Sequence, residues 1–265
     1  MSKPRPSWLR AHENLLLGLV SLLVALAPSA AYAAGGKPHC SLPTISGSFG
    51  AAALGQQAGG YAATLFLLTA DGNGNLSGSG TESLNGTLFF NVTVTGTYTA
   101  NTGCLFTATM LDSLGNTSNF SGVIGQNGYD LIGLSTDAGT RMQFSAYRLN
   151  KTQCTVASLA TRYEAQVTSP LTPNGSSTAN QEWSIQKNGS GTDTWVANYN
   201  GTISQGTGTA TFSVNSNCTY TETVTNSDGT TSHFFGVGSI KLNDIGWVSM
   251  ETDSGWVSMA TGYFY

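Results

Sequence analysis

The chain has little charge: Asp, Glu, Lys and Arg together make up 9% of its 265 residues. Gly, Ser, Thr and Asn fill the polar positions instead, and these residues suit short strands and tight turns better than charged amphipathic helices. The sequence has no cluster of basic residues, and its formal net charge is −4. An acidic surface repels a phosphate backbone, so we expect no binding to nucleic acid.

Long apolar runs are also rare, and the one near the N-terminus, Leu15–Ala27, is shorter than the ~20 residues that span a bilayer. Basic residues precede it (Lys3, Arg5 and Arg10), and the small-x-small site Ala31-Tyr32-Ala33 follows it. This order is typical of a secretory signal peptide, with a membrane anchor as the alternative. We predict a signal peptide at residues 1–33 and an exported mature chain without a transmembrane helix, located in the periplasm, outside the cell or on its surface.

Catalytic and metal-binding motifs are missing as well. The sequence contains no GxSxG, HExxH or CxxC pattern and no phosphate-binding loop, and its carboxylates are scattered. Ser184-Ile-Gln-Lys187 has the spacing of some acyl enzymes, but that motif opens a helix and this segment has the pattern of a strand. Asp71–Glu82 mimics an EF-hand loop, yet Leu76 stands where that loop needs glycine. We expect no catalytic residues, no metal and no cofactor, and a tight β-turn after Asp71.

Only four cysteines are present, and they reveal a duplication. Cys40 and Cys154 are 114 residues apart, and so are Cys104 and Cys218. Four cysteines allow three pairings, and an exported chain oxidises them. We predict the disulfides Cys40–Cys104 and Cys154–Cys218, because a duplicated unit should carry its own cross-link. A reactive thiol or a metal site is the alternative.

Further landmarks show that one β-rich unit is written twice. The segment Gly96–Thr109 returns, much altered, as Ala210–Thr223, and Asn85-Gly86-Thr87 returns as Asn200-Gly201-Thr202. The separation between matching residues changes slightly along the chain, and we place these changes at turns because turns tolerate insertions. The repeat predicts two domains after the leader, residues 34–150 and 151–265, whose junction is so short that they should touch.

Within the first copy, short alternating runs are separated by Asn-Gly and Asp-Gly corners, a pattern typical of β-hairpins. The candidate strands are Thr44–Phe49, Tyr61–Thr69, Leu76–Glu82, Thr87–Val94, Thr95–Ala100, Leu105–Leu111, Thr117–Ile124, Leu131–Ser135 and Arg141–Arg148. Such a meander tends to close on itself, since closure removes exposed edges. The predicted fold class is all-β, a tandem repeat of two similar antiparallel meander β-barrels of about eight strands each.

The first copy resembles uncharacterised secreted bacterial proteins. The resemblance lies in Thr69-Ala-Asp-Gly-Asn-Gly-Asn-Leu-Ser-Gly78, then Asn85-Gly86-Thr87, then Gly96-Thr-Tyr-Thr-Ala100 with Cys104, and a late Thr-Asp-x-Gly. The second copy keeps only the later part of this pattern. The resemblance implies a small β-barrel of lipocalin-like shape in each copy and implies no activity, because the shared motifs belong to turns and strands.

A tighter duplication lies near the C-terminus, where Gly246-Trp-Val-Ser-Met250 recurs as Gly255-Trp-Val-Ser-Met259. A turn at Thr252-Asp253 would place Trp256 opposite Ser249 and Trp247 opposite Ser258, so that both tryptophans share one face.

The other face of this hairpin is apolar and consists of Val248, Met250, Val257 and Met259. The matching strand of the first copy, Arg141-Met-Gln-Phe144, should turn Met142 and Phe144 inward and leave its polar residues in water. We therefore predict that the tryptophans point into the barrel. The Val and Met face should be an interface, either with the first copy or with another molecule.

Every tryptophan of the mature chain lies in the second copy: Trp183, Trp195, Trp247 and Trp256. Aromatic rings offer flat apolar surfaces to sugars and hydrophobic molecules, and an eight-stranded barrel can hold one small ligand. The leading functional hypothesis is an exported, non-catalytic binding protein that holds a small apolar or aromatic ligand, or a glycan, near these residues. A bulkier core in the second copy is the simpler explanation of the same tryptophans.

Two further functions remain open. A structural or self-associating cell-surface or matrix protein could use the apolar face and the terminal Tyr263-Phe-Tyr265 for assembly. An aromatic C-terminus is also typical of outer-membrane barrels, although paired cysteines and the lack of a clean lipid-facing alternation count against that hypothesis.

Overall fold

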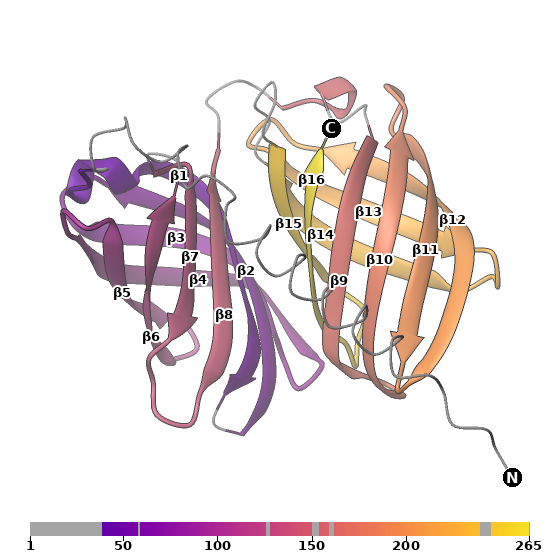
Figure 1. Ribbon diagram of the computed structural model, residues 1–265, viewed down its shortest axis with the longest axis horizontal. Coiled ribbons are helices and arrows are strands. Elements are labelled where there is room, and N and C mark those ends of the chain that lie inside the picture. The colour runs from indigo at the N-terminus through magenta and orange to yellow at the C-terminus, as the bar shows by residue number, and fades with distance from the viewer. Residues whose placement is uncertain are drawn as a thin grey trace, which may run out of the picture. The chain divides into compact units, whose positions relative to one another are not determined.

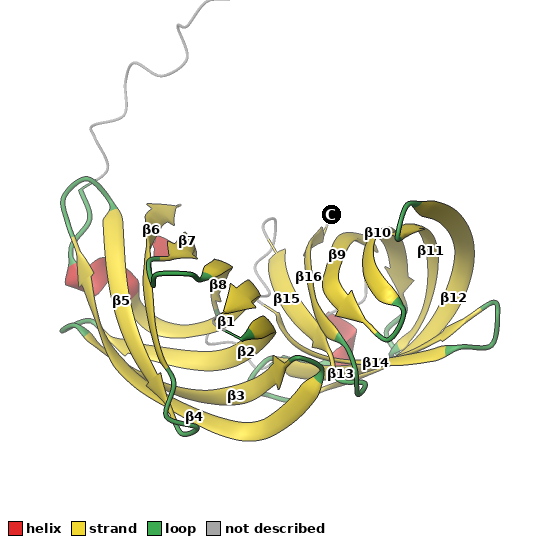
Figure 2. Cartoon of the chain, turned by 90° about the horizontal axis from the view of Figure 1, so that it is seen from below, coloured by secondary structure: helices red, strands yellow, loops and turns green. Residues whose placement is uncertain are grey.

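The computed structural model describes residues 39–57, 59–125, 128–149, 154–158, 162–238 and 245–264. The predicted signal peptide, the junction at 150–153 and Tyr265 lie outside this part of the chain. Strands dominate the described residues (Figure 1), and Figure 2 shows them from below. They form two closed barrels of eight strands each, so the predicted all-β tandem of antiparallel meander barrels is confirmed.

Barrel 1 follows the short 3-10 helix η1 (Leu42–Ile45). Successive strands pair antiparallel, and the last strand, β8, pairs back onto β1 to close the barrel. Its strands are β1 (Ser46–Gln57), β2 (Gly60–Asp71), β3 (Asn75–Leu84), β4 (Thr87–Ala100), β5 (Leu105–Asp112), β6 (Thr117–Gly125), β7 (Asp130–Ser135) and β8 (Arg141–Arg148).

Barrel 2 follows η3 (Val156–Ser158) and repeats this topology, with β16 pairing back onto β9. Its strands are β9 (Arg162–Thr172), β10 (Gly175–Ile185), β11 (Ser190–Tyr199), β12 (Thr202–Val214), β13 (Thr219–Asn226), β14 (Thr231–Gly238), β15 (Ile245–Glu251) and β16 (Val257–Phe264). No helix in the described part of the chain has the length and apolarity needed to cross a membrane.

Two details of the predicted strands of the first copy were wrong. β4 runs past the expected break after Val94, so the nine candidate strands are eight. β1 extends to Gln57, well beyond the expected end at Phe49, and its residues 49–54 are all buried. This stretch does not alternate because the inner face of β1 packs in the barrel core while its outer face packs against barrel 2.

The turns form where the sequence predicts them. Asn85 and Asn200 have φ angles of 51° and 50°, and Gly86 and Gly201 follow at 80° and 90°. Two successive positive φ angles are typical of the type I′ turns that close tight hairpins. Asp71 Oδ1 accepts hydrogen bonds from the backbone N–H of residue 73 at 2.7 Å and of residue 75 at 2.9 Å, so this carboxylate serves the turn.

The predicted disulfides Cys40–Cys104 and Cys154–Cys218 are confirmed, each across a sequence separation of 64 residues. Cys104 and Cys218 both adopt a left-handed backbone, with φ of 58° and 68°. The cross-link therefore occupies the same place in both barrels. Two disulfides fit an oxidising compartment outside the cytosol.

Each barrel has its own apolar core. Barrel 1 is filled largely by phenylalanine, and Met142 and Phe144 point inward as predicted, while Arg141 and Gln143 are exposed. Barrel 2 is filled by aromatic rings that are mostly tyrosine and tryptophan, namely Tyr163, Trp183, Phe212, Tyr220 and Trp247.

A third apolar cluster joins the two barrels, which belong to one unit spanning His39–Tyr265. Barrel 1 contributes outer-face residues of β1 and β2, and barrel 2 contributes the Val and Met face. The buried members on the strands are Ala52, Leu54, Ala63, Leu65, Val237, Val248, Met250, Val257 and Met259. The predicted apolar face of the second copy is thus an interface with the first copy.

Small residues allow this close contact. A Cβ atom on Gly50 of β1 would lie 2.6 Å from Val237 Cγ1. At the edge of the contact, the Gly255 N–H donates to the Gly86 carbonyl at 2.9 Å. The Ser83 hydroxyl donates to the Trp256 carbonyl at 2.6 Å.

The predicted register of the C-terminal hairpin was wrong. Trp247 pairs with Gly262 rather than with Ser258. Trp256 is outside the hairpin, because β16 begins at Val257. Trp247 points into barrel 2, whereas Trp256 lies at the junction of the two barrels, so the two tryptophans do not share a face.

The cause is a wider turn than expected. Asp253 accepts hydrogen bonds from the His233 backbone N–H at 2.8 Å and lies 2.9 Å from its ring Nδ1. The Thr252 N–H donates to the His233 carbonyl at 2.7 Å. These bonds tie the turn to β14, so residues 252–256 form a loop instead of a two-residue corner.

Candidate functional site

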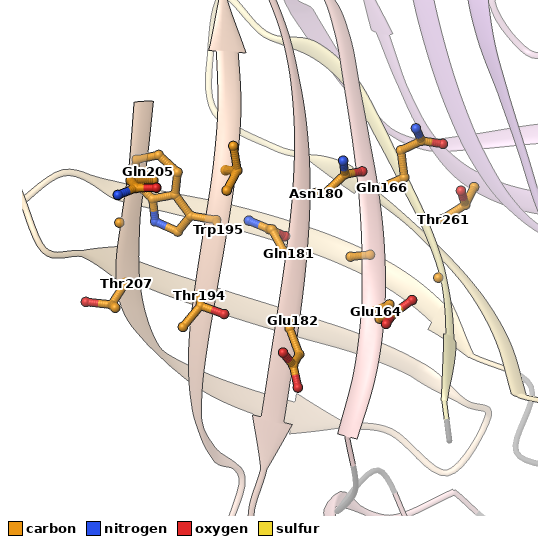
Figure 3. A pocket seen from close by; sticks show the side chains of 14 residues that line it. Glu164, Gln166, Asn180, Gln181, Glu182, Thr194, Trp195, Gln205, Thr207 and Thr261 are labelled. Atoms are coloured by element: carbon orange, nitrogen blue, oxygen red, sulfur yellow. The ribbon is translucent and has the colours of Figure 1, made fainter. Parts of the chain in front are cut away.

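A polar groove of about 920 Å³ crosses the outer surface of barrel 2. It passes over five neighbouring strands, β16, β9, β10, β11 and β12 (Figure 3). The pairing register sets its floor, in which Gly262, Ala165, Gln181, Trp195 and Gly206 are successive cross-strand partners. The side chains of these residues belong to the inner face of the barrel, so the floor is largely backbone.

Two rows of side chains flank this floor, because the residues before and after an inner-face residue point outward. Within each row, neighbours are direct cross-strand partners. The first row is Thr261, Gln166, Asn180, Val196 and Gln205, and the second is Glu164, Glu182, Thr194 and Thr207. Apart from Thr261, all are exposed. The groove therefore offers amides, hydroxyls and carboxylates to one ligand.

The charge of the groove is acidic. Glu164 and Glu182 are direct partners on β9 and β10. Arg162 lies beside them, with its Nη1 atom 3.9 Å from Glu182 Oε1, and both of these side chains are well exposed. An exposed pair of this kind contributes little stability, so its geometry can adapt to a ligand. Two carboxylates beside one guanidinium favour a neutral or cationic ligand over an anionic one.

Trp195 is the one tryptophan of the predicted ligand site that borders this groove. Its ring lies on the inner face, over Gly206, where a Cβ atom would be 2.6 Å from Trp195 Cζ2. Its Nε1 atom is buried and makes no hydrogen bond among the described residues. The indole therefore lies directly beneath the backbone floor of the groove.

The other three predicted tryptophans are elsewhere. Trp183 and Trp247 are 1% and 3% exposed and meet through Tyr163. The Tyr163 ring stacks on Trp183 at 6.0 Å and meets Trp247 edge-on at 5.1 Å. These two indoles lie in the core of barrel 2, while Trp256 is half-buried between the barrels.

Sequence reasoning missed a group of buried carboxyl groups inside barrel 2, because it treated the carboxylates as scattered. Glu222 and Glu251 are 4% and 3% exposed. Burial raises the pKa of Glu222 to about 8, with a smaller contribution from the charge of Asp193. Burial, followed by the charge of Asp253, raises the pKa of Glu251 to about 8. Both groups are therefore neutral acids at neutral pH.

Other buried acids follow the same rule. Burial raises the pKa of Asp193 to about 6, and in barrel 1 burial and the charge of Asp112 raise the pKa of Glu82 to about 7. Among the residues that the structure describes, no three His, Cys, Asp or Glu side chains gather in a way that could hold a metal ion. The buried acids are best explained as groups whose protonation is linked to folding.

Sequence analysis also did not single out the groove, although a signal was present. Residues 162–168 alternate strictly, with Tyr163, Ala165 and Val167 inward and Glu164 and Gln166 outward. That alternation predicts one polar face. It cannot say that five such faces line up, because alignment depends on register between strands.

Comparison with known proteins gives little further help. No family model matches the chain, and no curated protein matches it. Among solved structures, the chain is similar to the isotype 1 transferrin binding protein B of serogroup B Neisseria meningitidis, with 9% sequence identity and a TM-score of 0.34. The match covers 77% of this chain and 63% of that one.

Proposed function

We propose that this protein is an exported, non-catalytic binding protein whose groove on barrel 2 binds a neutral glycan. One observation carries the proposal: two parallel rows of outward-pointing side chains, most of them amides, hydroxyls and carboxylates, flank a groove that crosses five strands of the barrel. Sites on strands hold their side chains more precisely than sites on loops.

The chemistry of the rows suits sugar hydroxyls. Each of Gln166, Asn180 and Gln205 can donate and accept at once, as a hydroxyl also does, and Glu164 and Glu182 can accept from hydroxyl donors. Val196, which is 49% exposed, offers apolar contact to the C–H face of a sugar ring. The acidic balance of the groove argues against sulfated or uronic-acid glycans.

The interior of barrel 2 is a weaker candidate for an apolar or aromatic ligand. Trp183 and Trp247 are packed against Tyr163, Phe212 and Tyr220, so a ligand there would have to displace core side chains. Self-association through the Val and Met face is likewise disfavoured, because barrel 1 already covers that face.

A binding screen of the mature chain against neutral oligosaccharides tests the proposal. Because Trp195 lies beneath the groove, its fluorescence should change when the groove fills. Asn180→Ala or Gln166→Ala should each weaken binding about fivefold, as expected for about 1 kcal/mol from one hydrogen bond.

The matched control is Gln186→Ala, which removes an exposed amide in the turn between β10 and β11, outside the groove. It should leave the affinity unchanged. Absence of saturable binding to any neutral glycan, or equal loss in the control, would refute the proposed function.

A further inference from the structure

Barrel 1 contains one residue that barrel 2 lacks, in the middle of a strand. Between β3 and β4, Gly80 pairs with Val92 and Thr81 pairs with Phe90, so Asn91 is left unpaired as a β-bulge. Asn91 adopts a left-handed backbone, with φ of 56°. The matching pair in barrel 2, β11 with β12, runs in regular register throughout.

At the bulge, two residues of β4, Phe90 and Asn91, lie between the inward-facing Phe89 and Val92. Beyond it, Val92 is in the core of barrel 1. Before it, Leu88 packs in the cluster between the barrels, and Phe90 is 60% exposed. Phe90 points outward in the same way as Gln205, the residue that matches it in barrel 2, but it presents an aromatic ring where barrel 2 presents an amide. β-bulges are over-represented beside functional sites.

Phe90 borders a cleft of about 840 Å³ between the two barrels. Barrel 1 contributes Phe90 and Leu67, and barrel 2 contributes Phe235, Thr223 and His233. Phe235 is on the outer face of β14, where it packs at the edge of the apolar cluster between the barrels. The cleft thus has aromatic rings from both barrels and polar groups from β13 and β14.

The fold does not need a histidine at position 233, because asparagine makes the equivalent hydrogen bonds in barrel 1. In barrel 1 the same clamp is built with asparagine: the Asn119 N–H and side-chain amide bond Asp137 at 2.8 and 2.6 Å. In barrel 2, His233 holds Asp253 through its N–H and Nδ1. The carboxylate fixes the imidazole by Nδ1, so Nε2 is the ring atom that a ligand can meet.

We propose that this cleft is a second binding site, for a neutral aromatic molecule that carries a hydroxyl or carbonyl group. Phe90 and Phe235 contact the ring of the ligand, and His233 bonds its polar group. The three features that distinguish the barrels here, namely the bulge, the outward phenylalanine and the histidine in place of asparagine, all meet at this one cleft. The inference is independent of the glycan groove, which lies on other strands.

A fluorescence titration of the mature protein with 2-naphthol tests this inference. We expect saturable binding that Phe90→Ala weakens about five- to tenfold, since an aromatic contact contributes about 1 kcal/mol beyond its buried area. His233→Asn should weaken binding at least threefold while keeping the clamp, because asparagine holds this position in barrel 1.

Two control variants distinguish binding in this cleft from nonspecific hydrophobic binding and from binding in the groove. Leu134→Ala removes another side chain that is 60% exposed, on β7, and Asn180→Ala alters the glycan groove. Both should bind 2-naphthol as the parent does. Absence of saturable binding, or equal affinity in Phe90→Ala, His233→Asn and the controls, would overturn the inference.

Discussion

The buried glutamates of barrel 2 should make its stability fall as the pH rises. Burial raises the pKa of Glu222 and of Glu251 to about 8, from the ordinary glutamate value of 4.5. Above about pH 4.5 the unfolded chain releases these protons while the folded barrel keeps them until about pH 8. The stabilisation is therefore complete in acid and is lost through this window.

The size of the effect follows from the width of the window. Each glutamate should lower the free energy of unfolding by about 1.4 kcal/mol for every unit that the pH rises. Between about pH 5 and about pH 7.5 the loss is about 3 kcal/mol per glutamate. The two glutamates together approach the total stability of about 5–15 kcal/mol that a domain usually has. Barrel 2 should consequently be much easier to unfold at mildly alkaline pH than at pH 5.

Urea unfolding followed by tryptophan fluorescence measures this directly, because all four tryptophans of the predicted mature chain are in barrel 2. Glu251→Gln should reduce the pH slope by about 1.4 kcal/mol per unit. Glu164→Gln, on the exposed outer face, is the control for loss of a carboxyl group. A stability that is flat or rises between about pH 5 and pH 8 would contradict the reasoning.

Two further predictions concern the contact between the barrels and the cross-link. Gly86→Ala should destabilise the protein by about 1–3 kcal/mol more than Gly201→Ala in thermal or urea unfolding. Both positions have positive φ, but only at Gly86 would the new Cβ atom meet a neighbour, Gly255 Cα at 2.6 Å, so equal losses would argue against the contact. Replacing Cys154 and Cys218 with alanine should lower the free energy of unfolding by about 4 kcal/mol relative to the oxidised parent, and a urea midpoint equal to that of the oxidised parent would contradict this prediction.

Much of the fold could be predicted because the same β-rich unit occurs twice in the sequence, so that its turns and cysteines can be recognised in both copies. The equal spacing of the cysteines identified both disulfides, and the Asn-Gly corners identified hairpins that do form. The local sequence pattern predicted a turn less reliably where residues of the turn bind a neighbouring strand. The turn at Asp253 is wide because its carboxylate binds His233 on a neighbouring strand, a contact that hairpin symmetry alone cannot reveal.

The bulge at Asn91 shows a second limit. The shift in spacing between the copies was assigned to turns, yet the extra residue lies inside β4. The adjacent pair Phe89-Phe90 interrupts the alternation of this strand and was a usable signal. The candidate site depended on still longer-range information, since the groove exists only where the outer faces of five strands are in register.

The register also shows how the two copies diverged. The cross-strand pair Ala52–Leu65 of barrel 1 lies in the apolar cluster between the barrels. Gln166 and Asn180 form the equivalent pair in barrel 2, and there they line the exposed groove. One ancestral surface has thus become a docking face in barrel 1 and a polar face in barrel 2.

This divergence explains why the contact between barrel 1 and barrel 2 need not be repeated between one chain and the next. The free face of barrel 1 carries Ile132 and Leu134, which are 52% and 60% exposed and match the covered Val248 and Met250 of barrel 2. A head-to-tail contact between chains would press these aliphatic side chains onto the amides of the groove. Burying amides without partners costs about 1–3 kcal/mol each, which opposes the open-ended assembly that a repeated heterologous contact would otherwise produce.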